Sequence, residues 1–551
     1  MHRVMHAMKS FSDRHGRVKV RTTEQEQEAK RKEREQKLKA YKAGIESVFR
    51  KRQDGEFDDE LLSLTAQLLV GNPDIYTLWN IRREVLLLYK TKIAEEELGV
   101  KLEKEVSLTE QCLRSNPKSY GAWFHRGWAL DQHHAPDWHG ELVLFHCWDY
   151  RRLVVSRSNA SPQDEFLFST VKIEDNFSNY SAWHYRSKLL PIIHPDSQGL
   201  CPIKLAMVQS AAFTDPNDTS AWFYQRWLLG RDCSLQQRPR ASPCLAWLQL
   251  TDSVALVSCS EPTSEAPSLF LGDQKLAGNW WQPSSHVWIL QGKKWPTEMD
   301  ETVDFKVTAG GGVLQLSAVP GKERCYWGKP VLPSSKYSPN VTAELQEQLA
   351  SCEQLLQFEP DSKWTLLTSV LLMQAIDSKL HHSSVLSALE KLPKVDPMRV
   401  NYYHDLRSKY MLEHQLPTLL GKGQSPVLSI SLKSLQLTAL YYMHLLALVQ
   451  EVDLAHNDLT EPSLPALSSL QRCNRLVLSH NQLTSLKGFP SMPALCSLSL
   501  QGNQLSAEPG VVLGHLEAAS LSALYELNLE DNPCHQLPEL QSFISGLAKR
   551  K

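Results

Sequence analysis

Residues 116–126 read NPKSYGAWFHR, and this stretch decides the fold because variants of it recur on both sides of it. The other copies are NPDIYTLWNIRR at 72–83, FHCWDYRR at 145–152, NFSNYSAWHYR at 176–186 and DPNDTSAWFYQR at 215–226. In four copies an Asn or Asp precedes the tryptophan by seven residues. Successive tryptophans are 44, 25, 35 and 39 residues apart. Repeats of this length predict stacked helical hairpins.

The residue types of this motif suit a helix that packs between its neighbours. The opening Asn or Asp predicts a helix cap, and the Pro that follows suits the first helical position. The Tyr, Trp and Arg are expected near one face, with the Trp between hairpins and the Arg bound to carbonyls or carboxylates of the next layer. Weaker traces at 359–367 and 396–410 extend the pattern.

The spacing of 25 residues before the third copy is short, since a helical hairpin needs about 30 residues or more. Between Trp138 and Phe145 the chain lacks most of one helix and its Asn-Pro turn. Either this repeat is truncated or the sequence derives from an altered transcript. The residues leave both interpretations open.

Two further patterns lie outside the helical repeats. Residues 235–338 hold short runs typical of β-strands, which we interpret as a small β-sandwich inserted between hairpins. From about residue 425 the pattern L-x-L-x-x-N-x-L occurs four times and predicts leucine-rich repeats, in which each asparagine holds the turn after a strand. These asparagines are Asn457, Asn481, Asn503 and Asn532.

Composition narrows the class of protein. The 551 residues suggest roughly three or four domains, and the formal net charge of -2 argues against bulk binding to nucleic acid. The 11 cysteines form no C-x-x-C pair, which is typical of reduced thiols in a cytoplasmic protein. No apolar run predicts a membrane span, and residues 1–20 lack the apolar core of a secretory signal, which leaves only a weak transit-peptide pattern.

No common catalytic motif is present. The sequence contains no Walker A loop, no G-x-S-x-G and no H-E-x-x-H. One histidine-rich stretch, at 131–147, includes His133, His134, His139 and His146. Its spacing matches no common zinc pattern, so loop histidines are the simpler interpretation.

Lys118 is the candidate that stands out within the repeats. A cation in the first turn of a helix opposes the helix dipole, and the other full copies carry Asp74, Ser178 or Asn217 there. A lysine beside the free N–H groups of a helix start favours an anionic ligand such as phosphate. Tyr120 and His146 are candidate neighbours. A solvent-exposed lysine without a role is the alternative.

The repeated N-P-x-x-Y-x-x-W-x-x-R-R motif resembles the α subunits of protein prenyltransferases. The inserted strands and the C-terminal leucine-rich pattern resemble those of Rab geranylgeranyltransferase, the type II enzyme. The resemblance implies a mainly α, multidomain protein: an α-α helical-hairpin superhelix with an inserted β-sandwich and a C-terminal leucine-rich-repeat solenoid. The implied domains are an extension at 1–22, helical repeats at 23–234, an immunoglobulin-like β-sandwich at 235–338, further hairpins at 339–424 and leucine-rich repeats at 425–551.

The resemblance also implies an activity and partners. The α subunit embraces a β subunit that holds Zn²⁺ and the lipid, and the complex transfers geranylgeranyl from geranylgeranyl diphosphate to cysteines of Rab GTPases presented by a Rab escort protein. Lys118, Tyr120 and His146 match residues near the diphosphate, and no zinc ligand is expected in this chain. The shortened stretch before FHCW departs from the family pattern.

The competing interpretation is a non-catalytic helical-repeat or leucine-rich-repeat scaffold. Tetratricopeptide arrays share the hairpin architecture, but their period is 34 residues and their signature differs. The lysine in the second copy argues against a scaffold, because the other copies do without it.

Overall fold

A computed structural model describes residues 24–143, 148–194, 202–230, 245–250, 253–259, 262–271, 274–292, 303–309, 312–318, 339–421, 427–508, 510–547 and 549. His146 lies outside these residues. The chain divides into two compact units. The first comprises Met1–Lys172 and Lys188–Ile193, and the second comprises Ile173–Ser187 and His194–Lys551.

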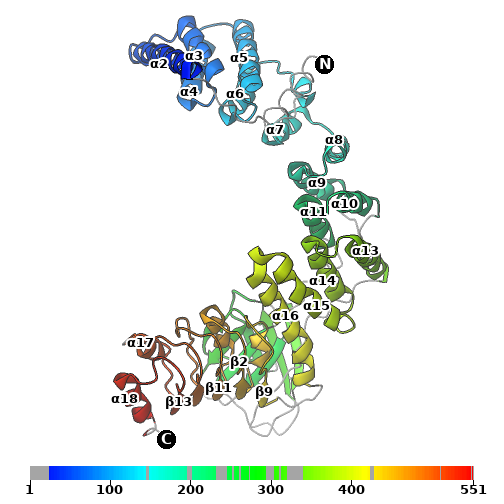
Figure 1. The fold of residues 1–551 in the computed structure, drawn as a ribbon, viewed down its shortest axis with the longest axis vertical. Helices are drawn as coiled ribbons and strands as arrows, with labels where there is room; N and C mark the ends of the chain where they lie inside the picture. The colour runs from blue at the N-terminus through cyan, green and yellow to red at the C-terminus, as the bar shows by residue number, and fades with distance from the viewer. Residues whose placement is uncertain are drawn as a thin grey trace. The chain divides into compact units, whose positions relative to one another are not determined.

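The first unit is an array of helices joined by short turns (Figure 1). Its elements are α2 (Glu24–Gln53), α3 (Asp59–Gly71), α4 (Tyr76–Lys90), α5 (Glu95–Ser115), α6 (Tyr120–Gln132), the 3-10 turn η1 (Gly140–Val143) and α7 (Trp148–Ser158). Within it α3 contacts α5 and α4 contacts α6, so the helices form two rows. Two more helices, α8 (Pro162–Asp175) and α9 (Tyr180–Ile193), cross the boundary between the units.

The motif tryptophans form the centre of the core of the first unit. Trp79 is 1% exposed and Trp123 is 6% exposed, and both pack with aliphatic side chains of α3 and α5. Burying one large apolar side chain contributes roughly 1.5–3 kcal/mol. The periodic tryptophans therefore hold the layers together, as the spacing predicts.

The second unit continues the helices on both sides of a long insertion. Its helices are α10 (Pro202–Thr214), α11 (Thr219–Gly230), α13 (Pro339–Phe358), α14 (Lys363–Asp377), α15 (His382–Val395) and α16 (Val400–Leu419), with the 3-10 turn η2 (Pro397–Arg399). Across the insertion, the Gln209 side chain on α10 donates to the Ser351 hydroxyl on α13 at 3.1 Å. Helices far apart in sequence thus form consecutive layers.

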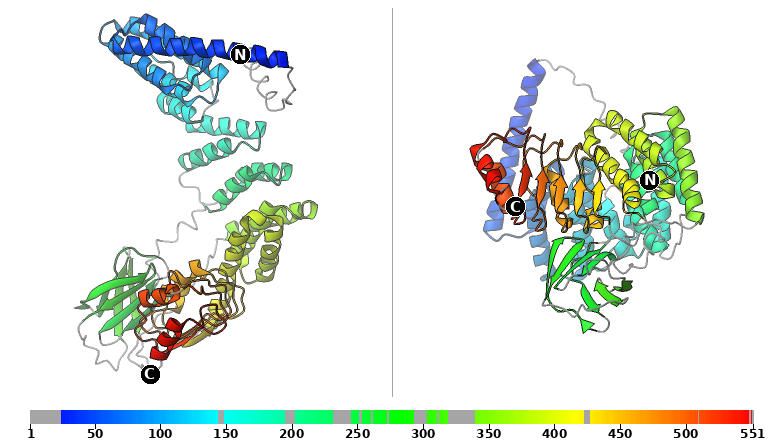
Figure 2. Two further views of the ribbon diagram at one scale, coloured as in Figure 1. Left: turned by 60° about the vertical axis from the view of Figure 1, so that its left-hand side comes forward. Right: turned by 90° about the horizontal axis from the view of Figure 1, so that it is seen from below.

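The insertion contains two four-stranded antiparallel sheets (Figure 2, green). Their orders are β1-β2-β6-β5 and β4-β3-β7-β8. The strands are β1 (Leu245–Leu250), β2 (Val254–Cys259), β3 (Ser268–Leu271), β4 (Gln274–Lys275), β5 (Asn279–Ser284), β6 (Val287–Gln291), β7 (Val303–Ala309) and β8 (Gly312–Ala318). Leu248, Val257 and Leu290 of one sheet share a buried cluster with Leu269 and Val307 of the other, so the two sheets enclose a common core.

The C-terminal region is a five-stranded parallel sheet of order β13-β12-β11-β10-β9. Its elements are β9 (Ser429–Ser431), η3 (Met443–Leu446), β10 (Glu451–Asp453), η4 (Glu461–Ser469), β11 (Arg475–Val477), β12 (Ser497–Ser499), α17 (Val511–Ala518), β13 (Glu526–Asn528) and α18 (Pro538–Leu547). The Asn481 side chain donates to the carbonyls of Leu454 and Leu478 and accepts from the backbone N–H of Leu459. The role predicted for the repeated asparagines is therefore confirmed.

The first sheet of the insertion packs against the C-terminal region within the second unit. The Ser258 hydroxyl donates to the carbonyl oxygen of His444 at 2.7 Å, and the His286 and His444 rings stack at 4.2 Å. Burial, with a smaller contribution from His286, lowers the pKa of His444 to about 3. Among the helices that the structure describes, none is long and apolar enough to cross a membrane.

Candidate functional site

The turn that opens each full motif copy has one recurring geometry. Asn116 ends α5 as its C-cap, and its side-chain oxygen accepts from the backbone N–H of Lys118 at 3.2 Å. The side chain of Ser119, not of Asn116, caps α6 by accepting from the N–H of Ala122. The prediction that the motif Asn caps the following helix is therefore wrong, and Pro117 lies in the turn rather than in the first turn of α6.

The motif tryptophans lock these turns. Each indole N–H donates to the backbone carbonyl of the residue after the opening Asn or Asp, six positions earlier. The pairs are Trp79 with Pro73 at 2.8 Å, Trp123 with Pro117 at 2.9 Å, Trp183 with Phe177 at 2.8 Å and Trp222 with Pro216 at 3.1 Å. A buried indole needs such a partner, so the tryptophan fixes the turn as well as the core.

The motif arginines form buried ion pairs between layers. In three copies the guanidinium binds both oxygens of one glutamate, and the prediction of carboxylate partners is confirmed there. The pairs are Arg82 with Glu105, Arg126 with Glu141 and Arg151 with Glu165, at N···O distances of 2.5–2.8 Å. Two-point pairs of this kind combine charge with fixed geometry.

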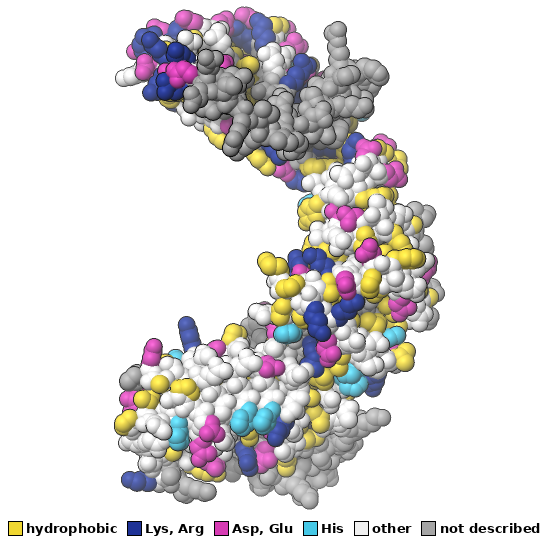
Figure 3. All heavy atoms as spheres, viewed as in Figure 1, with side chains coloured by type: hydrophobic (Ala, Val, Ile, Leu, Met, Phe, Trp, Pro, Cys, Tyr) yellow, Lys and Arg dark blue, Asp and Glu magenta, His cyan; other side chains and the backbone are white. Residues whose placement is uncertain are grey.

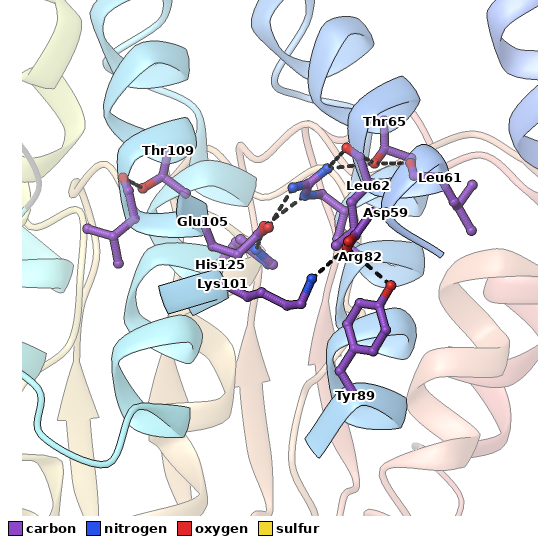
Figure 4. A network of polar contacts seen from close by, with 11 residues as sticks. Asp59, Leu61, Leu62, Thr65, Arg82, Tyr89, Lys101, Glu105, Thr109 and His125 are labelled. Carbon is purple, nitrogen blue, oxygen red and sulfur yellow. Dashed lines mark hydrogen bonds and ion pairs between the residues drawn. The ribbon is translucent and has the colours of Figure 1, made fainter. Parts of the chain in front are cut away.

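Figure 4 shows the first of these layers. Besides Glu105, Arg82 binds the carbonyl of Leu62 and the hydroxyl of Thr65, while the buried ring of His125 contacts Glu105 at 2.9 Å. Burial raises the pKa of Glu105, but the hydrogen bond from His125 and the charge of Arg82 outweigh it and lower the pKa to about 2. Burial also lowers the pKa of His125. This network is structural, because it is closed to solvent.

The third copy keeps the arginine–glutamate bonds between layers, although the stretch of chain before it is short. Glu141 comes from η1, a single 3-10 turn, and it accepts from Arg126 and from the Tyr150 hydroxyl at 2.6 Å. Arg151 of the third copy binds the carbonyl of Leu142 at 2.9 Å. The described part of the short repeat thus supplies the same interlayer carboxylate as a full helix.

The fifth copy is out of register by one residue. Arg226 follows its tryptophan by four positions, whereas the other motif arginines follow by three. Gln225 takes the interlayer position and donates to the side-chain oxygen of Gln348 on α13 at 2.9 Å. The assignment of Arg226 to the same role as Arg126 is therefore wrong.

The motif tyrosines do not share the buried face of Trp and Arg. Tyr76 is 60% exposed, Tyr120 is 68% exposed and Tyr180 is 57% exposed. The expectation that the three motif side chains lie near one face is wrong for the tyrosines. Phe124, one residue after the second motif tryptophan, is also 65% exposed.

The sequence suggested that Lys118 lies in the first turn of α6. This prediction is wrong, because Lys118 lies two residues before the helix begins. Its side chain is exposed, and its ammonium forms no ion pair or hydrogen bond with the residues that the structure describes. In the neighbouring turn the equivalent residue, Asp74, accepts from the side-chain nitrogen of Asn116 at 2.9 Å. Lys118 and Tyr120 therefore flank one exposed turn, whereas the position of His146 is outside the described residues.

The histidine-rich stretch shows no metal centre in its described part. His133 and His134 stack at 4.7 Å, and His133 lies 4.0 Å from a carboxylate oxygen of Glu103. Within the described ranges, no group of three or more His, Cys, Asp or Glu could hold a metal ion.

The sequence matches the family described as "Protein prenyltransferase alpha subunit repeat" over residues 58–89, 102–133, 162–192 and 205–232. These stretches contain the first, second, fourth and fifth motif copies and pass over the third. The repeated layers, with their tryptophan-locked turns, thus define a prenyltransferase α subunit as the class of protein.

Relatives refine this assignment. The geranylgeranyl transferase type-2 subunit alpha of Sus scrofa is 40% identical over 571 residues, which cover 97% of this chain and 98% of that protein. The Homo sapiens protein of the same name is 40% identical over 579 residues, which cover 97% and 100%. The chain belongs to the family of geranylgeranyl transferase type-2 alpha subunits.

One solved structure has a weaker likeness. It is the Candida albicans protein geranylgeranyltransferase-I complexed with GGPP, with 14% identity and a TM-score of 0.28 over 68% of this chain and 91% of that chain. At that score the likeness adds nothing to the family assignment.

Proposed function

We propose that this chain is the α subunit of a heterodimeric Rab geranylgeranyltransferase, active only together with a β subunit. The complex transfers geranylgeranyl from geranylgeranyl diphosphate to C-terminal cysteines of Rab GTPases, which a Rab escort protein presents in the cytoplasm. Family membership supports the subunit assignment. The exposed turn before α6 supports a direct part in the reaction.

The observation that carries this part is that the exposed Lys118 ammonium pairs with none of the residues that the structure describes. The equivalent positions of the other full copies hold Asp74, Ser178 and Asn217, so the turn itself does not require a cation. The first N–H groups of α6 add to the positive field. A cation at a helix start favours a diphosphate group.

The chemistry follows from this charge. Zn²⁺ would be held by the β subunit, not by this chain, and when bound it would keep the Rab cysteine in its thiolate form, which is the nucleophile. As the new C–S bond forms at the allylic carbon, the C–O bond breaks and negative charge grows on the departing diphosphate. Lys118 stabilises that charge, and one donor of this kind is typically worth about 3 kcal/mol. The Tyr120 hydroxyl is a second donor, and His146 is assigned as a third from its place in FHCW.

The exposed aromatic side chains support a partner surface on the row of α4 and α6. Tyr76, Tyr120 and Phe124 are each at least 60% exposed, and aromatic side chains are enriched in protein interfaces. Arg83 lies 5.0 Å from the ring of Phe124 and adds a cation to this surface. We assign the surface to contact with the β subunit.

The proposal extends to the other regions. We assign residues 1–22 to an extension, 23–234 and 339–424 to the helical superhelix, 235–338 to an immunoglobulin-like β-sandwich and 425–551 to a leucine-rich-repeat solenoid. The common core of the two antiparallel sheets supports the sandwich. The asparagine bonds between successive parallel strands support the solenoid.

The test uses the full chain co-expressed with its cognate β subunit. We expect a stable heterodimer by native mass measurement, which transfers geranylgeranyl to a Rab bound to an escort protein. Lys118→Ala is expected to leave assembly intact and to lower turnover by roughly 10²-fold. Lys92→Ala, which removes another exposed lysine between two helices of the first unit, is the matched control. Unchanged turnover of Lys118→Ala rejects its role, and failure to assemble rejects the subunit proposal.

A further inference from the structure

The turn that carries Lys118 is built on the turn that opens the first motif copy. The side-chain nitrogen of Asn116 donates to a carboxylate oxygen of Asp74 at 2.9 Å, and the side-chain oxygen of Asn116 accepts from the N–H of Lys118 at 3.2 Å. The Ser119 hydroxyl donates to the carbonyl of Pro73 at 3.1 Å. Two successive hydrogen bonds therefore connect the Asp74 carboxylate to the backbone of Lys118.

The side of this turn that faces the core is fixed by close packing. A Cβ atom at Gly121 would lie 3.0 Å from the Trp79 ring and 3.4 Å from the carbonyl oxygen of Pro73, which is tighter than most carbon contacts. The equivalent residues of the other full copies are Thr77, Ser181 and Ser220. Glycine thus permits a close approach of the two turns at this layer. On the exposed side, the bond between Asp74 and Asn116 is what joins them.

The bond between these two side chains is not a general requirement of the repeat. The turns of the fourth and fifth copies are joined by the Ser220 hydroxyl, which donates to the carbonyl of Ser178 at 3.4 Å. There the residues equivalent to Asp74 and Asn116 are Ser178 and Asp215, and in this described pair of turns their side chains form no bond with each other. The bridge of an aspartate and an asparagine accompanies the turn that carries the lysine.

The surface of the first unit makes the placement of a single cation important. On the face visible in Figure 3, Lys and Arg side chains of this unit lie among Asp and Glu side chains. Charges of mixed sign give a weak field at a distance, so an ammonium acts on a diphosphate mainly when the two are close. A group that acts at close range needs neighbours that hold it in place.

We propose that Asp74 is a positioning residue for the transfer reaction and acts through Asn116 to hold the turn that carries Lys118. This inference rests on the proposed function, since it assumes that Lys118 stabilises the departing diphosphate. The useful property of Asp74 is its acceptor oxygen and not its charge, because a carboxylate near the turn weakens the positive field there. Asp74→Asn keeps an acceptor for Asn116 and removes the charge, whereas Asp74→Ala removes both.

The experiment uses the full chain in its heterodimer with the β subunit and a Rab bound to an escort protein. It measures the single-turnover rate of transfer with geranylgeranyl diphosphate bound beforehand, and the Kd of that diphosphate. We expect Asp74→Ala to lower the rate roughly tenfold and to change Kd by less than about threefold, because the ammonium is needed most as the diphosphate departs. Asp74→Asn should keep the rate within about twofold of wild type.

The matched control is Asp59→Ala, which removes another exposed acid of the first unit and its bond to Lys101 at 2.7 Å. It should leave the rate unchanged. If Asp74→Ala does not assemble with the β subunit, Asp74→Ser gives the same comparison, because the fourth copy holds Ser178 at this position.

A double-mutant cycle distinguishes positioning from a general loss of structure. If Asp74 acts through Lys118, adding Asp74→Ala to Lys118→Ala should slow transfer no further. An equal slowing of wild type and of Lys118→Ala would show that Asp74 acts independently, and the inference would be wrong. A rate of Asp74→Asn as low as that of Asp74→Ala would also overturn it, since the charge would then be the active property.

The outcomes separate this inference from the proposed function. If Lys118→Ala slows transfer while Asp74→Ala transfers at the wild-type rate, the positioning role is wrong and the role of Lys118 stands. If Lys118→Ala transfers at the wild-type rate, the role of Lys118 fails and the positioning role fails with it.

Discussion

Gln225 on α11 donates to the side-chain oxygen of Gln348 on α13 across 2.9 Å, at the position where three earlier layers pair an arginine with a glutamate. A buried ion pair costs much desolvation and repays it only with good geometry, whereas two amides cost less and bind more weakly. The helical stack therefore changes from ionic to neutral bonding at the layer beside the insertion. The same change leaves Arg226, the next residue, half-buried beside the rings of Phe223 and Trp364.

Restoring the ionic pair at this layer should reveal strong coupling. Gln225→Arg alone adds a guanidinium beside Arg226 without a partner, and Gln348→Glu alone buries a lone carboxylate, so each should destabilise the second unit. The double variant should recover stability, with a coupling free energy of about 1–3 kcal/mol in urea unfolding. Additive effects of the two substitutions would show that the side chains do not meet.

Glu141 should contribute far more to stability than a surface acid. Glu141→Gln leaves Arg126 buried without a carboxylate, which typically costs about 3–5 kcal/mol. The control is Glu110→Gln, whose exposed pair with Arg114 is worth at most about 0.5 kcal/mol. Hydrogen-exchange protection of peptides from α6 and α7 is the measurement, because local opening reports this layer alone. Equal protection in both variants would contradict the role of Glu141.

Acid should loosen the contact between the first sheet and η3. The folded-state pKa of His444 is depressed from 6.5 to about 3, so its neutral form contributes stability above pH 6.5 that is lost as pH falls toward 3. The loss is at most about 1.4 kcal/mol for each pH unit in that window. Exchange rates of β2 amides, corrected for intrinsic pH effects, should rise at pH 4.5, and rise less in His444→Gln. Identical pH profiles of the two proteins would refute this.

Asn481→Ala should destabilise the C-terminal region. The substitution leaves the carbonyls of Leu454 and Leu478 and the N–H of Leu459 without their partner inside the sheet. Unpaired buried groups cost about 1–3 kcal/mol each, so a total of about 2–4 kcal/mol is expected after relaxation. Asn474→Ala, at a side chain without such bonds, should change the urea midpoint little.

The periodic motif was sufficient to predict the helical layers, because tryptophan and arginine recur where cores and interlayer bonds need them. It did not distinguish the cap of the helix from the turn before it. Asn116 and Ser119 are both good capping residues, and the choice depends on where α5 ends. The register shift at Arg226 could have been found in the sequence by counting residues from Trp222. It was overlooked because the fifth copy ends in an arginine, as the other copies do.

The candidate site was predictable only in part. The unusual lysine among equivalent positions was visible in the sequence, and the structure shows that it is exposed, so its role stays a prediction. The sequence could not show that Tyr120 faces solvent, since tyrosine is common both in cores and at surfaces. Nor could it show the cations around Trp364, because Arg226, Lys363 and Arg399 come from three separate segments of the chain.

The single turn η1 has a consequence for how such an array tolerates change. Most of a helix is missing there, yet Glu141 still reaches both Arg126 and Tyr150. Whether the array tolerates a deletion therefore depends on which side chains are removed, and not on how many residues are lost. Loss of a long stretch that spares the acid leaves the joint between two layers closed, whereas loss of the acid alone opens it.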